Sequence, residues 1–108
     1  MVDTEHLSTL FKRSLPFFTA LGDELRQQLL LLMMDGKLRS VAELTAETQL
    51  SRPAISHHLK ILKQAGVIVE QKKGRQVYYY PQPGQYYETV KALIEEIDKA
   101  IKTAKESV

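Results

Sequence analysis

Residues 51–66 carry two kinds of side chain at helical spacing, in the run SRPAISHHLKILKQAG. Three aliphatic residues recur at i, i+4 and i+7, which puts them on one face of a helix; they are Ile55, Leu59 and Leu62. A second face carries hydroxyl, imidazole and ammonium groups and no acid, from Pro53, Ser56, His57 and Lys60. A short helix that is anchored by aliphatic residues and offers hydrogen-bond donors and positive charge suits the major groove of DNA.

Positive charge gathers in the same part of the chain. Between Ser51 and Gln76 there are six basic residues and one acid, Glu70, so this segment carries a net charge of +5. The whole chain carries +2, which leaves −3 for the rest. A basic segment on a mildly acidic body is typical of nucleic-acid binders, whereas a solvated charged face usually mixes the two signs.

These patterns divide the candidate DNA contacts by their chemistry. We expect phosphate contacts from the basic side chains Arg52, Lys60, Lys73 and Arg75. Ser56 and His57 are the candidates for base edges, with Pro53 packing against thymine methyl groups. Ser51 is expected to cap the start of the helix and is also a candidate DNA-binding residue.

Other chemistry finds little support in the sequence. The adjacent His57 and His58 diverge by about 100° on a helix, so their rings cannot chelate one ion as an i, i+4 pair would. The chain has no cysteine, which excludes thiolate metal sites and disulfides and fits a reducing cytoplasm. It has neither a Gly-rich phosphate loop nor an HExxH motif. We therefore expect a cytoplasmic protein with no enzymatic activity, no cofactor and no metal site.

The length of 108 residues and the hydrophobic content of 44% fit a single domain over residues 1–108. The longest apolar run, Leu29–Met34, is far shorter than the roughly 20 residues that a membrane span needs. A domain of this size buries a modest share of its surface, so association with a second copy would add stability.

Four helices are expected in the first part of the chain, over about residues 4–20, 24–34, 41–48 and 51–66. Asp23 is a suitable N-cap for the second. Ser40 and Glu43 form the S-x-x-E pattern of a capping box, which predicts the start of the third. Since the last two of these helices are short and closely linked, they predict a helix-turn-helix.

The pattern then changes from helical to strand-like. Residues 67–72 and 75–80 are rich in β-branched and aromatic side chains, and Lys73 and Gly74 form a basic turn between them. Pro81 stops the second strand. These features predict a β-hairpin with a basic tip.

A last helix is expected over about residues 85–105, with an apolar stripe longer than so small a core can absorb. The surplus stripe indicates a partner helix. The predicted fold class is therefore mainly α with a β-hairpin wing (α+β), a winged helix-turn-helix of order ααααββα.

Three segments together resemble the ArsR family of bacterial transcriptional repressors. They are FTALGDELR at 18–26, LSRPAISHHLKILKQAG at 50–66 and GRQVYY at 74–79. The resemblance covers about residues 15–80. Its SHHLKILKQAG portion is specific for the family, whereas a helix-turn-helix outline alone would also fit MarR-like regulators.

The resemblance implies a homodimer that represses a DNA operator and releases it when an effector binds. It implies that residues 51–62 form the recognition helix, and that Lys73, Gly74 and Arg75 form a wing tip against the DNA backbone or minor groove. It also implies that the first and last helices form the dimer interface, through Leu7, Leu10, Phe11, Val90, Leu93, Ile94, Ile97 and Ile101.

Two metal sites known in the family are not expected here. One uses a Cys-x-Cys pair at the start of the helix before the turn, where this chain has Arg39–Leu44; the other uses histidine with acids on the last helix, where this chain has four acids and no histidine. Carboxylates alone are poor ligands for a selective zinc or nickel site. The effector is then an organic molecule, a partner protein, or absent.

The expected partners are double-stranded DNA and a second copy of the chain, with no membrane and with an unidentified small-molecule effector. Two alternatives stay open. One is a winged-helix protein-interaction module without DNA binding, which the acid-free face of the recognition helix disfavours. The other is a MarR-like regulator that responds to a small organic ligand.

Overall fold

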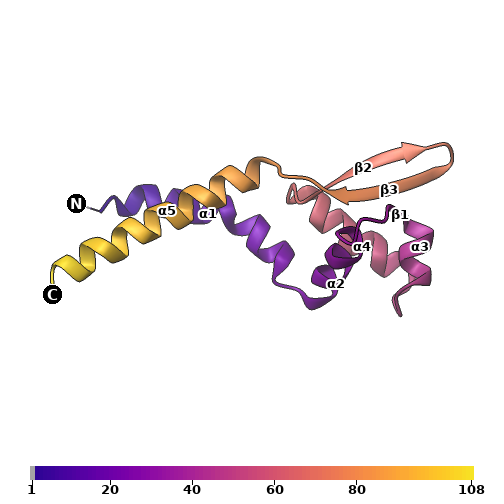
Figure 1. Cartoon of the computed structure of the whole chain (residues 1–108), viewed down its shortest axis with the longest axis horizontal. Helices are drawn as coiled ribbons and strands as arrows, with labels where there is room; N and C mark the ends of the chain where they lie inside the picture. The colour runs from indigo at the N-terminus through magenta and orange to yellow at the C-terminus, as the bar shows by residue number, and fades with distance from the viewer. Residues whose placement is uncertain (1) are drawn as a thin grey trace.

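The computed structural model describes residues 2–108 and shows five helices and a small antiparallel sheet within them (Figure 1). In chain order the elements are α1 (Thr4–Leu21), α2 (Glu24–Met33), β1 (Arg39–Ser40), α3 (Val41–Ala46), α4 (Arg52–Gln64), β2 (Ile68–Lys73), β3 (Gln76–Pro81) and α5 (Gln85–Glu106). The described part measures 58 × 25 × 23 Å. No helix in it is long and apolar enough to cross a membrane.

The predicted winged helix-turn-helix is confirmed, with one strand added. The sheet has the order β1-β3-β2, and β1 pairs with β3 through Arg39 opposite Tyr79 and Ser40 opposite Tyr78. The predicted order ααααββα lacks β1, because two residues are too few to show a periodicity. The hairpin strands begin and end one residue later than predicted, and α3 ends at Ala46 rather than near residue 48.

Local hydrogen bonds start three of the helices where the sequence predicts. The Asp23 carboxylate accepts the Arg26 N–H at 3.0 Å. Ser40 Oγ accepts the Glu43 N–H at 3.2 Å, and the Glu43 carboxylate accepts the Ser40 N–H at 3.2 Å, which completes the capping box. Ser51 Oγ accepts the N–H of residue 54 at 3.3 Å at the start of α4. Each bond satisfies a backbone donor that the helix itself leaves unpaired.

The core lies between α2, α3, α4 and the base of the hairpin. The predicted aliphatic face of α4 is confirmed, because Ile55, Leu59 and Leu62 are all buried. They join a cluster of buried residues from the neighbouring elements, among them Leu29, Leu44, Val67 and Ile68. Burying these side chains fixes the direction of α4, so its opposite face is turned outward.

The helices α1 and α5 lie side by side at the end of the molecule that holds both termini, and the hairpin projects at the opposite end (Figure 1). At their inner end the rings of Phe17 and Tyr86 stack with centroids 4.6 Å apart. The chain thus divides into a helical pair at one end and a winged helix-turn-helix at the other.

Candidate nucleic-acid interface

The outward face of α4 carries the polar residues predicted to contact DNA. Ser56, His57 and Lys60 are exposed, and so are the three residues at its start, Ser51, Arg52 and Pro53. Pro53 lies in the first turn, where its missing N–H breaks no helical hydrogen bond. The buried aliphatic face therefore leaves a full face of donors and positive charge available to a ligand.

The predicted wing tip is a two-residue turn between β2 and β3. Lys73 pairs with Gln76 at the last position of the ladder, and Gly74 and Arg75 close the turn. Gly74 has φ of +61° and Arg75 does not have a positive φ, which is the pattern of a type II′ hairpin turn. Lys73, Gly74 and Arg75 are all exposed.

Helix α4 and the wing meet in a small polar cleft. Arg52 and Ser56 from α4 line it together with Arg75 and Gln76 from the wing, and its volume is about 180 Å³. Sequence reasoning assigned the two arginines and Ser56 to one function, and the fold brings these three side chains to one place. Gln76 was missed, because a single glutamine at the edge of a strand gives no signal in the sequence.

Glu70 also lines this cleft, although it is the one acid of the basic segment. Lys63 Nζ donates to its carboxylate at 2.7 Å, and the Tyr79 hydroxyl donates at 3.5 Å. The hydrogen bond from Lys63 holds the pKa of Glu70 below its ordinary value, and the same bond raises the pKa of Lys63. Its negative charge is therefore neutralised within the protein.

Arg26 connects the recognition helix to the helices behind it, a role that sequence reasoning missed. Its Nε donates to the Ala20 carbonyl at 2.7 Å and its Nη2 to the Thr19 carbonyl at 2.9 Å, both at the end of α1. Its Nη1 lies 3.4 Å from His58 Nδ1 on α4. Because an arginine stays charged, this contact requires His58 to accept through Nδ1. His58 is half-buried, whereas His57 is exposed.

Nothing among residues 2–108 forms a cluster of three or more histidines and acids that could hold a metal ion. The rings of His57 and His58 are tilted by 58° with centroids 5.6 Å apart, in line with their divergence on the helix. The stretch that would carry the cysteine pair in metal-sensing relatives begins with β1, where Arg39 is buried and ion-paired to Asp35 and Glu47.

The predicted dimer residues fall into three groups by their exposure. Leu10 and Leu93 are buried within the protomer between α1 and α5, so they have little surface left for a partner. Phe11, Ile94 and Ile101 are about half exposed. Leu7, Val90 and Ile97 are partly exposed.

Comparison with known proteins shows the family to which this chain belongs. A model described as the bacterial regulatory protein, arsR family, matches residues 23–69. An uncharacterized HTH-type transcriptional regulator of Methanocaldococcus jannaschii is 32% identical over 87 residues, which is 81% of this chain and 97% of the relative. The transcriptional repressor SdpR of Bacillus subtilis is 40% identical over 62 residues, 57% of this chain and 68% of the repressor.

The fold agrees with solved structures of the same family. An ArsR-like transcriptional regulator from Rhodococcus sp. RHA1 superposes with a TM-score of 0.72 at 29% identity, over 91% of this chain and 94% of that one. These relatives are transcriptional regulators rather than enzymes, as the sequence led us to expect, and the family match favours the ArsR outline over a MarR-like one. The chain belongs to the ArsR family of bacterial regulatory proteins, which are helix-turn-helix regulators of transcription.

Proposed function

We propose that the protein is a homodimeric repressor that binds a near-palindromic DNA operator in the cytoplasm. One observation carries the proposal. The acid-free face of α4 and the basic wing tip share a polar cleft, lined by Arg52, Ser56 and Arg75. A helix in the major groove flanked by a basic hairpin can contact base edges and the adjacent phosphates at once.

Within this proposal the contacts divide by chemistry. Arg52, Lys60, Lys73 and Arg75 neutralise phosphates and give binding its salt dependence. Ser56 and His57 contact base edges, and Pro53 packs against thymine methyl groups. Ser51 and Gly74 hold the backbone of the helix start and of the wing turn beside the DNA.

The dimer would form through the exposed face of α1 and α5. Ile94 is 58% exposed and Ile101 50% exposed on α5, and Phe11 is 49% exposed on α1. A monomer seldom leaves so many large apolar side chains on one face. A second copy would cover them and set the two recognition helices about 34 Å apart, in successive major grooves.

A repressor role is supported by relatives that are described as repressors. Besides SdpR, they include the arsenical resistance operon repressor of Escherichia coli, although HlyU of Vibrio cholerae is described as an activator. A metal effector at the two sites known in the family is disfavoured, because this chain has no cysteine and no histidine on its last helix. An organic molecule, a partner protein or no effector at all stay open as alternatives.

A double substitution tests the role of α4. In Ser56→Ala with His57→Ala, we expect the preference for operator over random duplex DNA to fall by roughly 1–3 kcal/mol per lost contact, because base contacts specify while phosphate contacts do not. Gel-shift titrations against both duplexes measure the ratio. The matched control is His6→Ala with Ser8→Ala, the same residue types exposed on α1.

The outcomes separate the proposal from its rival. If the double variant loses affinity equally for all sequences, Ser56 and His57 do not contact base edges. If the unaltered protein fails to bind any duplex at low salt, the winged-helix protein-interaction module becomes the better account.

A further inference from the structure

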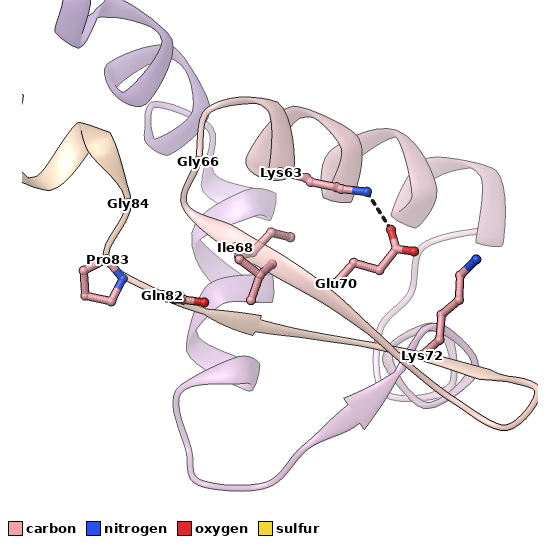
Figure 2. Close-up of a pocket in the computed structure, with 9 residues that line it drawn as sticks. Lys63, Gly66, Ile68, Glu70, Lys72, Gln82, Pro83 and Gly84 are labelled. Carbon is pink, nitrogen blue, oxygen red and sulfur yellow. Dashed lines mark hydrogen bonds and ion pairs between the residues drawn. The ribbon is translucent and has the colours of Figure 1, made fainter.

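A second cavity lies at the base of the wing, away from its tip (Figure 2). Its volume is about 610 Å³, within the range of small-molecule sites in proteins. Three parts of the fold supply its lining: the end of α4 with the turn after it (Lys63, Gly66), strand β2 (Ile68, Val69, Glu70, Lys72) and the link from β3 to α5 (Gln82, Pro83, Gly84). We name this cavity the wing-base groove.

The groove has an apolar part and a charged part. Val69 and Pro83 supply aliphatic surface, and Ile68 also lines the groove although it is almost fully buried. Lys63 and Lys72 bring two ammonium groups to the end that also holds Glu70 (Figure 2). An apolar wall with cations at one end fits a small organic anion, whose body packs on the wall while its anionic group meets the lysines.

Two glycines, Gly66 and Gly84, bring the backbone segments on either side of the groove into close contact. A Cβ on Gly84 would lie 2.7 Å from the Gly66 carbonyl oxygen, so the link to α5 passes directly over the end of α4. Gly66 itself has φ of +78°, a conformation that glycine adopts without strain. The groove therefore exists in the free protein at the point where the recognition helix, the wing and the last helix join.

Glu70 connects the groove to the candidate DNA interface. It lines the wing-base groove and also the polar cleft that holds Arg52 and Arg75. Its charge is neutralised by Lys63 at 2.7 Å. A ligand anion that draws Lys63 to itself leaves Glu70 without this partner, beside the arginines that phosphates would contact.

We propose that the wing-base groove binds small organic anions with an apolar body. Binding separates Lys63 from Glu70, and the unpaired Glu70 carboxylate then weakens DNA binding at the neighbouring polar cleft. The coupling half of this proposal rests on the proposed DNA-binding function; the binding half does not. The two are therefore measured separately.

The first experiment measures binding without DNA. Octanoate and 2-naphthoate are titrated into the full-length ¹⁵N-labelled protein, with 1-octanol as the uncharged match. We expect amide shifts at residues 63–72 and 82–84 for the two anions and not for the alcohol. Lys63→Gln should weaken octanoate binding about tenfold, whereas Lys99→Gln, the same change at an exposed lysine of α5 that pairs with Glu96, should not.

The second experiment measures coupling. Saturating octanoate should weaken operator binding by the unaltered protein about tenfold, a typical allosteric coupling. Glu70→Gln should keep or strengthen octanoate binding, because Lys63 is then free, and should abolish the effect on operator affinity. Each variant is compared with and without octanoate, so its own DNA affinity cancels.

Three results would overturn the proposal. They are failure of both anions to bind more tightly than about 1 mM, amide shifts confined to the exposed face of α1 and α5, and an octanoate effect on DNA that persists in Glu70→Gln. Absence of DNA binding without any ligand would instead count against the proposed function, and would leave the binding result standing.

Discussion

At the scale of single residues, the side chains that organise this protein are charged. Arg39 is 6% exposed and forms ion pairs with Asp35 and Glu47, while donating to the carbonyl of Leu32. It thereby joins the end of α2, strand β1 and the end of α3. Sequence patterns treat charged residues as surface residues, so neither Arg39 nor Arg26 was predicted to be buried.

Asp35 gives the stability of the fold a dependence on pH. Two bonds from Arg39, at 2.6 and 2.7 Å, lower the pKa of Asp35 from 3.8 to about 2. The folded state thus holds this carboxylate ionised where the unfolded chain binds a proton. The resulting stabilisation is present above pH 3.8 and is lost as the pH falls toward about 2.

We expect Asp35→Asn to lower the urea midpoint at neutral pH, and the difference from the unaltered protein to shrink below about pH 4. Equilibrium urea unfolding between about pH 2.5 and 7 measures this. A difference that stays constant down to the lowest pH would show that the Arg39 pair does not stabilise the folded state.

Ser14 is the converse case, a buried polar group without a partner. It is fully buried on α1, and its Oγ has no hydrogen-bond partner among residues 2–108. Because a buried unpaired hydroxyl is costly, Ser14→Ala should raise the free energy of unfolding by about 1 kcal/mol. Urea unfolding at one fixed protein concentration measures the change. The exposed Ser8→Ala is the control and should shift it by less than about 0.5 kcal/mol; a loss of stability in Ser14→Ala would contradict the expectation.

At the scale of elements, the sequence predicted what local patterns encode. The caps at Asp23, Ser40 and Ser51 formed as expected, since each needs only atoms a few residues apart. Strand β1 was not predicted, because its two residues become a strand by pairing with Tyr78 and Tyr79, almost 40 positions later.

We expect the wing to bind DNA through its positive charge and not to distinguish one base sequence from another. Lys73 lies at the exposed end of β2, next to the turn. Lys73→Ala should therefore weaken binding to operator and random duplex by the same factor and reduce the slope of log affinity against log salt by about 1. Titrations at several salt concentrations measure the slope, with the exposed α5 variant Lys91→Ala as control. A loss of affinity for the operator alone would show that the wing contacts bases.

At the scale of the whole molecule, the wing and the exposed faces of α1 and α5 occupy opposite ends of a body 58 Å long (Figure 1). The recognition helix lies between them, and Arg26 links it to the end of α1. A second copy could therefore pack against α1 and α5 without covering the residues proposed to contact DNA.

A charge placed on the helical pair should separate the dimer. Ile94→Glu puts a carboxylate where a partner would pack, so we expect a monomer in sedimentation equilibrium. We also expect operator affinity to fall at least about tenfold, because a monomer binds a single half-site and loses the gain in affinity from binding two half-sites together. Leu38→Glu is the matched control, because Leu38 is an apolar residue that is 40% exposed and lies just before β1, outside α1 and α5. A dimer that survives Ile94→Glu would move the interface to another surface.

The sequence by itself determined the recognition helix, the basic hairpin and the family, because helix caps, apolar periodicity and turn residues act over short distances along the chain. The tertiary structure decided what depends on residues far apart. It buried Arg26 and Arg39, paired β1 with β3, gathered Arg52, Ser56 and Arg75 into one cleft, and set Glu70 between that cleft and the wing-base groove. Most of these contacts join residues far apart in the chain, so no local pattern of the sequence indicates them.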